Sequence, residues 1–451
     1  MKQSIILRIE LMDIRKLYNL GLLFILLTIL IGCSEQKEIK SRKQQWLDDI
    51  AYFENVYLQE SNTFPEDSLE KCQSILDQLK QQVESLDDNE LILKFSRCVS
   101  MANNGHTVIP LHFMAKVPLR FYKFSDGVHI VKTDSASTPY LGAKVLKIND
   151  LTIEDVEEKL KPYLSGIDRW RSYKASNYLC SPEILHGIGL SEKNSMTLTL
   201  LKDKDTLKAT FTTKEMKKKY YENWSDLYPD PADSGWHYAL NPNIQKPLYL
   251  DKMQEGVFYH FIDSTKSAYF SINGYWNQAD DFEDKIEDFL EVLETKTDYN
   301  VIMDLRYFTG GNYIIPVDLA TKPPKIIDSN KKIYLITSNK TFSAGLVTAA
   351  RIKYYAEEKI VIVGEEVGDN LKFWAENDSY QLPNSGINIY DSDAEHDWKD
   401  NEFTFGKSFW VNYFYGVPAK SLAVDQEIKL SFTEYMQGDD PILNWILNQP
   451  S

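Results

Sequence analysis

Two segments of the chain carry residue types that could catalyse acyl transfer, and one of them contains Ser343. This serine follows an apolar run from Lys332 to Thr337 and a turn of four to five residues, and it opens a helix-like stretch that reaches about Tyr355. A hydroxyl there points out of the carboxyl edge of a parallel sheet, where open α/β sheets bind ligands. The first amides of the helix face the same place and can stabilise a developing oxyanion. A helix N-cap is the simpler role for such a serine, and this segment alone favours it.

The other segment is a pair of glycines, Gly310 and Gly311, which ends the preceding strand pattern. Paired glycines let backbone N–H groups approach a substrate closely. An amide of either glycine, together with the amide of Ala344, would form an oxyanion hole with two donors. Loss of one such donor typically adds about 3 kcal/mol to the activation barrier. The alternative interpretation of the glycine pair is a plain turn.

His106 is a candidate for the general base that would activate Ser343. Among the seven histidines, it alone follows a helix-terminating glycine, Gly105, and precedes a strand pattern. An imidazole titrates near neutrality, so it can take a proton from a serine and return it to a leaving amine. A histidine that donates a structural hydrogen bond is the alternative. His112 lies six residues further on and does not suggest a metal pair, and no H-E-x-x-H segment is present, so we expect neither a metal nor a cofactor.

These groups need a scaffold, and residues 255–451 alternate strand and helix patterns that would provide one. Apolar runs typical of buried parallel strands are separated by stretches of helical length, which predicts a βαβ core. The expected strands are Ser267 to Ile272, Tyr299 to Leu305, Lys332 to Thr337 and Ile360 to Gly364, and the expected helices are Phe282 to Leu293 and Ser343 to Tyr355.

The chain before this core divides into a helical region, a strand-rich region and a linker. Apolar residues recur at helical spacing within residues 33–105, which predicts a helical N-terminal domain that acts as a cap. In residues 106–215, a strand that ends at Asn149 and Asp150, a helix and a hairpin resemble a PDZ module, which binds an extended peptide as an added strand. A scaffold insert is the alternative, because no clear carboxylate-binding glycine loop precedes the strand. Residues 216–254 form an aromatic linker.

The order of these motifs resembles the tail-specific, or C-terminal-processing, serine protease family. Asp304-Leu305-Arg306 precedes the glycine pair, and the segment around Ser343 is followed by a strand and Gly364-Glu365. The likeness extends through residues 382–386 and 438–441, and it covers nearly all of the mature chain. The sequence most resembles bacterial lipoprotein members of the branch that includes the tricorn protease core. The resemblance implies a mixed α/β and β fold with a helical N-terminal cap, a PDZ-like insert and a C-terminal βαβ protease core with a crotonase-like or ClpP-like sheet.

The resemblance also indicates which base to expect. One branch of the family uses a Ser–Lys dyad whose lysine follows the Gly-Glu segment, but Asp369 stands about there in this chain and Lys372 is displaced. The tricorn-like branch instead takes a histidine from an Asp-Gly-His-Thr segment. Residues 104–107 of this chain read Asn-Gly-His-Thr, so the resemblance favours His106 as the base.

Two departures leave the orienting group open. Tricorn-like enzymes have a serine immediately before the histidine and a distant glutamate that orients this serine, whereas Gly105 stands there in this chain. Asn104 stands where relatives often carry aspartate. Glu365, Glu376 and Glu402 are all candidates for the orienting acid.

The N-terminus has the pattern of a bacterial lipoprotein signal. Four basic residues precede an apolar run of about fifteen residues, Leu17 to Ile31, which is short of the roughly 20 residues that a membrane span needs. The run ends in Leu30-Ile31-Gly32-Cys33-Ser34, which resembles a lipoprotein box. We therefore expect residues 1–32 to be a signal peptide and Cys33 to be lipidated, with a single transmembrane helix as the alternative. Ser34 favours sorting to the outer membrane, on its periplasmic or surface side, within a bacterial cell envelope.

Composition narrows the remaining possibilities. A formal net charge of −16 argues against nucleic acid as a partner, and an aromatic content of 13% indicates a folded chain. Cys72 and Cys98 lie in one helical region and could pair. Three buried thiols, at Cys72, Cys98 and Cys180, are the favoured interpretation.

Together these patterns predict a membrane-anchored serine endopeptidase of the cell envelope that acts on peptide or protein substrates. Ser343 would attack the peptide carbonyl, and His106 would serve as base and then as acid. The first alternative is a catalytically weak or inactive peptide-binding lipoprotein on the same fold. The second is an esterase of the α/β-hydrolase type, which is disfavoured because Thr341-x-Ser343-x-Gly345 lacks the first glycine of a nucleophile elbow.

Overall fold

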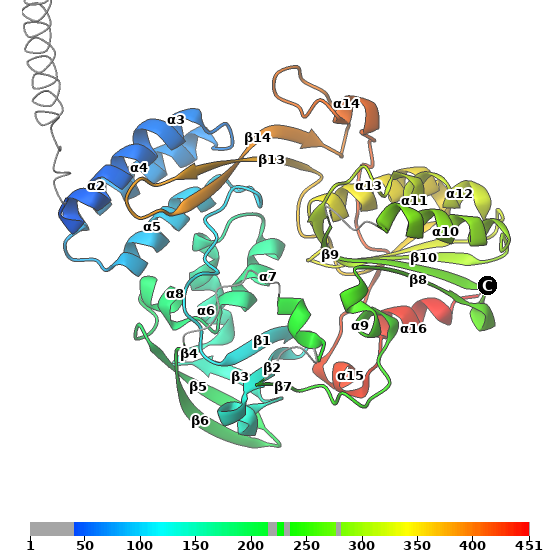
Figure 1. The fold of residues 1–451 in the computed structure, drawn as a ribbon, viewed down its shortest axis with the longest axis horizontal. Coiled ribbons are helices and arrows are strands. Elements are labelled where there is room, and N and C mark those ends of the chain that lie inside the picture. Colours follow the sequence, from blue (N-terminus) through cyan, green and yellow to red (C-terminus); the bar gives the residue numbers. More distant parts are fainter. Residues whose placement is uncertain (1–39, 215–222, 230–234, 277–280, 451) are drawn as a thin grey trace, which may run out of the picture. The chain divides into compact units, whose positions relative to one another are not determined.

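The computed structural model describes residues 40–214, 223–229, 235–276 and 281–450 (Figure 1). The predicted signal peptide, the predicted lipidation site at Cys33 and parts of the predicted aromatic linker lie outside these residues. The chain divides into two compact units, Met1–Gln45 and Trp46–Ser451, and all three sheets belong to the second. Within the described residues, no helix combines the length and the apolar character that crossing a membrane requires.

A six-stranded sheet forms the core of the C-terminal region (Figure 1). Its strand order is β15–β12–β11–β10–β9–β8, and all neighbours pair in parallel except β8, which is antiparallel to β9. All residues of β10 except Gly311 are buried, as the apolar pattern predicts for a parallel strand covered on both faces. The strands are β8 (Val257–Ile262), β9 (Ser267–Trp276), β10 (Asn300–Gly311), β11 (Ile333–Thr337), β12 (Ile360–Gly364) and β15 (Gln426–Glu427).

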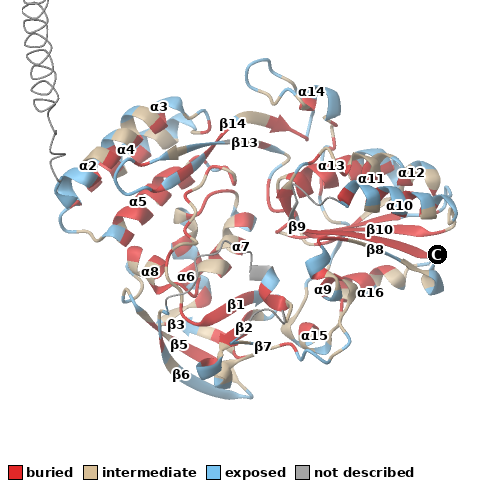
Figure 2. Ribbon diagram, in the orientation of Figure 1, coloured by how far each residue is buried: buried red, intermediate tan, exposed pale blue. Residues whose placement is uncertain are grey.

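Helices pack on both faces of this sheet (Figure 1). Val301 and Met303 of β10 join the core beneath α10, α11 and α13, whereas Ile302 joins the core beneath α16. This division follows from the alternation of side chains along a strand. Figure 2 shows the resulting band of buried residues along β9 and β10. The helices of this region are α9 (Leu248–Asp251), α10 (Phe282–Glu294), α11 (Val317–Thr321), α12 (Pro323–Ile326), α13 (Ala344–Ala356), α14 (Asn412–Tyr415), α15 (Phe432–Gln437) and α16 (Pro441–Leu447).

A buried ionic network joins two of the sequence motifs. Arg306 of β10 donates from Nε to Asp304 Oδ1 at 2.9 Å, and its two terminal nitrogens donate to the carboxylate of Asp440 at 3.2 and 2.9 Å. The second oxygen of Asp304 accepts from the Tyr269 hydroxyl at 2.7 Å. Asp440 also caps α16 by accepting from the amides of residues 442 and 443. The Asp-Leu-Arg motif and the C-terminal Gly-Asp-Asp-Pro motif therefore meet in the structure, where they hold the C-terminal helix against the sheet.

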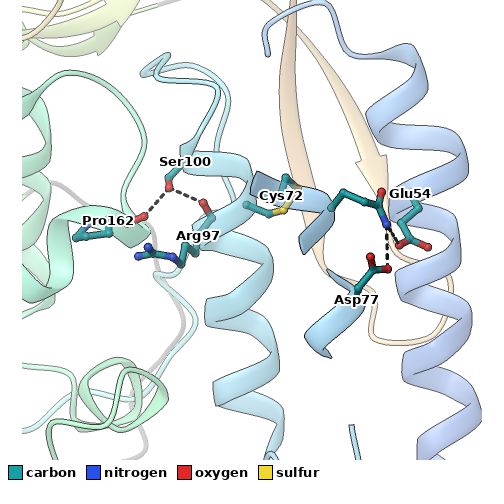
Figure 3. Close-up of a disulfide and its surroundings, with 8 residues drawn as sticks. Glu54, Cys72, Asp77, Arg97, Ser100 and Pro162 are labelled. Carbon is teal, nitrogen blue, oxygen red and sulfur yellow. Dashed lines mark hydrogen bonds between the residues drawn. A yellow bond between two sulfur atoms is a disulfide. The ribbon is translucent and has the colours of Figure 1, made fainter. Parts of the chain in front are cut away.

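The N-terminal region is helical, as predicted. Its helices are α2 (Arg42–Tyr52), a π-helical turn η1 (Phe53–Tyr57), α3 (Leu58–Glu60), α4 (Glu66–Gln82) and α5 (Asp88–Ser100). Cys72 of α4 forms a disulfide with Cys98 of α5 (Figure 3). The favoured expectation of three free thiols is therefore wrong for this pair, because the packing of two neighbouring helices brings the two sulfur atoms together. Cys180 is a buried free thiol, as expected.

The strand-rich region forms a second, antiparallel sheet with the order β1–β2–β3–β5–β6 and with β4 and β7 at its side. The predicted hairpin and the predicted helix from Ile153 are both present, whereas α7 and α8 were not predicted. The elements are β1 (Leu119–Phe124), β2 (Gly127–Asp134), β3 (Lys144–Ile148), β4 (Leu151–Thr152), α6 (Ile153–Leu160), α7 (Asp168–Tyr178), α8 (Pro182–Gly187), β5 (Ser195–Lys202), β6 (Asp205–Thr212) and β7 (Trp236–Tyr238). Short 3-10 turns connect elements at η2 (Ser135–Tyr140), η3 (Lys161–Tyr163), η4 (Asn223–Leu227), η5 (Met253–Glu255), η6 (Asp263–Thr265) and η7 (Glu357–Lys359).

A long hairpin, β13 (Lys372–Gln381) and β14 (Asn388–Asp397), forms the third sheet and was not predicted. Its turn packs into the core of the N-terminal helices, where Asp49 accepts hydrogen bonds at 2.8 Å from the amides of Asn384 and Ser385. The Leu-Pro-Asn-Ser-Gly motif is therefore this turn. The hairpin connects the region that holds Ser343 to the helical region that precedes His106 (Figure 1).

Candidate active site

Ser343 lies at the N-cap position of α13, but its hydroxyl does not cap the helix. Its backbone has φ 53° and ψ −121°, and its side chain makes no capping hydrogen bond. A residue with a Cβ adopts a positive φ only at a cost in free energy, and such strain is concentrated at functional sites. The N-cap interpretation therefore fails, and the hydroxyl is partly exposed and free of this duty.

Contacts with the end of β10 hold the turn that carries Ser343. The amide of Phe342 donates to the carbonyl of Phe308 at 3.1 Å, and the hydroxyl of Thr341 donates to the carbonyl of Leu305 at 2.8 Å. A Cβ at Gly345 would lie 2.0 Å from the same Phe308 carbonyl oxygen, so only glycine fits there. The first turn of α13 therefore packs closely against β10, the strand that ends in Gly310 and Gly311.

The predicted oxyanion donors lie at this junction. β10 runs through Gly310 and ends at Gly311, whose φ of 129° is accessible to glycine. The pairing of β10 with β9 shifts register just before Gly310, and such irregularities re-aim the backbone. Ala344 is the first residue of α13, so its amide has no acceptor within the helix. Gly310 and Gly311 end β10 and Ala344 begins α13, and these two elements contact each other at Phe308; the role of the three residues as donors stays a prediction.

His106 lies beside the serine turn, within a column of aromatic rings. Its ring stacks on Phe342, the neighbour of Ser343, with centroids 4.5 Å apart, and on Phe373 of β13 at 5.4 Å. Trp170 stacks on Phe342 at 3.9 Å, and His396 of β14 stacks on Phe373 at 5.0 Å. The structure therefore brings the predicted base against the residue that precedes the predicted nucleophile, although His106 and Ser343 are 237 positions apart in the sequence.

Both ring nitrogens of His106 are buried and have no hydrogen-bond partner among the described residues. Burial, together with the charge of His396, lowers the pKa of His106 to about 3. The imidazole is therefore neutral at physiological pH, the form that accepts a proton. No hydrogen bond joins the ring to Ser343 here, so the predicted role of His106 as a base would need the ring to leave its stacked position.

The hairpin β13–β14 fixes the segment that carries His106. The side-chain amide of Asn104 donates to the hydroxyls of Thr107 and Ser392 at 3.0 and 3.3 Å, and its carbonyl oxygen accepts from the amide of Trp374 at 3.2 Å. Backbone bonds between Val108 and Tyr390 continue this attachment. An aspartate at position 104 could not donate the two side-chain bonds, which explains why this chain carries asparagine where the resemblance suggested aspartate.

The three predicted orienting acids occupy different surroundings. Glu376 has a left-handed φ of 59°, and its carboxylate lies 3.3 Å from Nε2 of His396, not against His106. Glu365 lines a cavity of about 260 Å³ between the serine turn and the antiparallel sheet. Glu402 is exposed. These surroundings do not single out one of the three glutamates as the orienting acid, so that role stays a prediction.

A fourth carboxyl group, that of Asp369, is buried near His106 and was not among the predicted acids. Its burial raises its pKa to about 7, against the lowering effects of the Asn370 amide and of Arg169. Asp369 stands about where one branch of the resembled family has a lysine, and no role was predicted for it. Its neighbours come from distant segments, so no local pattern reveals its burial.

One group in the described residues has the geometry to hold a metal ion. Asp87, Glu90 and His186 offer ligand atoms within 4.8 Å of one another. Asp87 and Glu90 form the capping box of α5, and Asp87 Oδ2 already lies 3.0 Å from the Lys193 ammonium group. These contacts explain the group as a structural cluster that holds the start of α5.

Solved structures are similar to this chain in fold, whereas comparisons with protein families and curated proteins find no match. No protein-family model and no curated protein matches the chain. Solved structures do match, and those of CPAF show that the chain shares their fold. One of these structures is mature CPAF complexed with lactacystin, which aligns over 90% of this chain and 97% of its own with a TM-score of 0.57 and 12% identity. A second structure of mature CPAF gives a TM-score of 0.56 over 90% of this chain and 96% of its own, also at 12% identity.

Tricorn protease aligns over 91% of this chain and 37% of its own, at 12% identity and a TM-score of 0.37. That likeness is too weak to establish a shared fold. At 12% identity, the match to CPAF establishes a mixed α/β fold with several sheets, and the activity has to be inferred from the site.

Proposed function

We propose that this chain is a serine endopeptidase in which Ser343 is the nucleophile and His106 the base. The observation that carries the proposal is the backbone of Ser343, which is held at φ 53° at the start of α13 without a capping bond, in a chain with the fold of CPAF. Such strain presents the hydroxyl at the carboxyl edge of the sheet, where the first helix amide also points. The stacking of His106 on the adjacent Phe342 supports the choice of base.

The reaction follows from these positions. The oxygen of Ser343 attacks the peptide carbonyl carbon while a ring nitrogen of His106 takes the hydroxyl proton. The amide of Gly310 or Gly311 and that of Ala344 bind the oxyanion. The C–N bond then breaks as His106 returns the proton to the leaving amine, and water hydrolyses the acyl-enzyme by the same route.

The finer architecture is part of the proposal. The antiparallel sheet of residues 106–215 would act as a PDZ-like module, because its strand, helix and hairpin order resembles one. The six-stranded sheet would be the crotonase-like or ClpP-like core of a catalytic domain at 255–451, preceded by the helical domain at 33–105 and the aromatic linker at 216–254. The signal pattern at 1–32 and Cys33 supports a lipid anchor in the bacterial cell envelope, on the periplasmic or surface side of the outer membrane.

A library of unstructured peptides, analysed by mass spectrometry, tests the proposed activity. Wild-type chain should cleave internal peptide bonds, whereas Ser343→Ala and His106→Ala should each lower the rate at least about 1,000-fold. His112→Ala is the matched control, because this histidine lies six residues away and has no proposed role. Equal cleavage by wild-type and Ser343→Ala chains would refute the proposal.

The second candidate is a peptide-binding protein without activity, and the unpartnered ring of His106 favours it. This alternative predicts that peptides bind equally well to wild-type and His106→Ala chains and that neither chain cleaves them. Isothermal titration with peptides that remain intact afterwards would establish it.

A further inference from the structure

The carboxyl group of Asp369 lies near His106, and no structural role explains its burial. Asp369 is only 4% exposed, and its Oδ1 accepts from the amide of Asn370 at 2.8 Å. Its Oδ2 is buried without a hydrogen-bond partner among the described residues. A buried carboxyl oxygen that lacks a partner costs free energy, and such exceptions call for a specific explanation.

The place of this oxygen supplies the explanation. A Cβ built on Gly105 would lie 3.4 Å from Asp369 Oδ2 and 2.6 Å from the ring of Phe342. The carboxyl group therefore lies against Gly105, the residue before His106. Phe342, the residue before Ser343, contacts Gly105 at the same place. Because Gly105 has no side chain, the ring of Phe342 and the carboxyl group of Asp369 can both pack close to its backbone.

Packing holds the Asp369 loop against the serine turn. The amide of Gly368 donates to the carbonyl of Thr341 at 2.9 Å, and a Cβ on Gly368 would lie 2.5 Å from the carbonyl oxygen of Asn339. The loop after β12 is thus attached to the loop after β11. Asp369 therefore keeps its place relative to Ser343 when the ring of His106 turns.

We propose that Asp369 is the positioning residue for His106, accepting a hydrogen bond from one ring nitrogen when the other nitrogen faces Ser343. The proposal rests on the proposed peptidase function. It accounts for three buried atoms without partners, Asp369 Oδ2 and the two ring nitrogens, because one rotation of the imidazole pairs the carboxylate with the ring and the ring with the hydroxyl. The carboxylate fixes the tautomer and stabilises the imidazolium that forms when His106 takes the serine proton.

The charged groups around Asp369 determine how this arrangement depends on pH. Arg169 of α7 donates from Nε to the carbonyl of Val367 at 3.0 Å and pairs with Glu366 at 2.8 Å, so its charge is largely satisfied beside the loop. Burial keeps the pKa of Asp369 at about 7, whereas the pKa of His106 is lowered to about 3 by burial and by His396. Below pH 7 the carboxyl group is therefore neutral, and above it the group is ionised. The rate of Ser343 acylation should rise through about pH 7 as Asp369 loses its proton, while His106 stays neutral throughout.

The first test measures the rate at which a fluorophosphonate probe labels Ser343 from about pH 5 to pH 9. Asp369→Asn should label about 100-fold more slowly and lose the rise through pH 7, and Asp369→Glu should recover part of the rate and the rise. Glu358→Gln, which removes an exposed carboxylate that does not pair with Arg169, should behave like wild type. Wild-type rate and pH profile in Asp369→Asn would overturn the proposal.

A second test needs no catalysis and no variant of Asp369. Nitrogen NMR of the wild-type chain, with the His106 signals assigned through His106→Gln, should show these signals shifting as a group titrates near pH 7. No shift over this range would overturn the proposal. A shift in a chain whose Ser343 is never labelled would support the contact between Asp369 and His106 while refuting the peptidase function, so the two failures are distinguishable.

Discussion

Single residues at the candidate active site are held in costly states. Ser343 has a left-handed backbone, and both nitrogens of His106 lie buried without partners among the described residues. Strain of this kind persists only where the surrounding structure imposes it. Here the hydrogen bond from Phe342 to Phe308 and the close fit of Gly345 impose it. The cost in free energy therefore falls on Ser343 and His106, the two residues that the proposed reaction uses.

Replacing Ser343 by glycine should give a more stable protein than replacing it by alanine, and both changes should abolish labelling. Glycine adopts positive φ without the penalty of a Cβ, so Ser343→Gly should raise the free energy of unfolding by about 1 kcal/mol relative to Ser343→Ala. The two variants lack the same hydroxyl, so urea unfolding of both isolates the backbone effect. A glycine variant less stable than the alanine variant would show that the backbone at 343 is not strained.

Secondary-structure elements from distant parts of the chain build the site. The serine belongs to the loop between β11 and α13, whereas the histidine follows α5 and is held by the β13–β14 hairpin. The same hairpin reaches Asp49 in α2 with its turn. The hairpin is therefore the element that aligns the helical region with the serine turn.

Asn104→Asp should weaken this alignment, although aspartate is the residue that the resemblance suggested. The change removes two side-chain donor bonds, to Thr107 and Ser392, and adds a carboxylate close to the buried Asp391 that Thr107 also contacts. Loss of about 2 kcal/mol in the free energy of unfolding should follow, with slower Ser343 labelling. Chemical denaturation with Asn103→Asp as the exposed neighbouring control measures it. Equal stability of the two variants would contradict the assigned contacts.

The disulfide between α4 and α5 should stabilise the helical region. Cys72 and Cys98 are 26 positions apart, and a closed loop of that length contributes about 3 kcal/mol. Thermal unfolding with and without reductant should differ in wild type and in Cys180→Ala, but not in Cys72→Ala/Cys98→Ala. A wild-type midpoint unaffected by reductant would contradict the pairing.

At the scale of the whole molecule, the end of the chain secures the centre of the sheet. Asp440 lies 134 positions after Arg306, yet it accepts two hydrogen bonds from that buried guanidinium group. Burial of an ion pair is costly, but removal of one partner leaves an uncompensated charge. The C-terminal motif therefore supports the strand that ends in Gly310 and Gly311, the predicted oxyanion donors.

Asp440→Ala should accordingly cost about 3 to 5 kcal/mol in the free energy of unfolding. Glu427→Ala, which breaks an exposed pair with Lys429, should cost less than about 1 kcal/mol. Urea denaturation of both variants gives the comparison. Similar losses in the two would show that the buried network does not hold the C-terminal helix.

Strands β9 to β12 and helices α10 and α13 could be predicted from the sequence, because buried parallel strands leave long apolar runs such as Val301 to Leu305. The β13–β14 hairpin was missed because charged residues such as Asp391 and Glu395 interrupt the apolar pattern of its strands, and its packing depends on Asp49 and Asn104 far away in the chain. The burial of Asp369 depends on similar long-range contacts, so no local pattern predicts it.

Labelling with a fluorophosphonate probe, followed by mass-spectrometric mapping of the modified peptide, tests most directly whether Ser343 is an activated nucleophile. The structure predicts one modified residue, Ser343, with labelling abolished in Ser343→Ala and slowed at least about 100-fold in His106→Ala. Labelling at another serine, or equal labelling of the wild-type and Ser343→Ala chains, would contradict the proposed peptidase function.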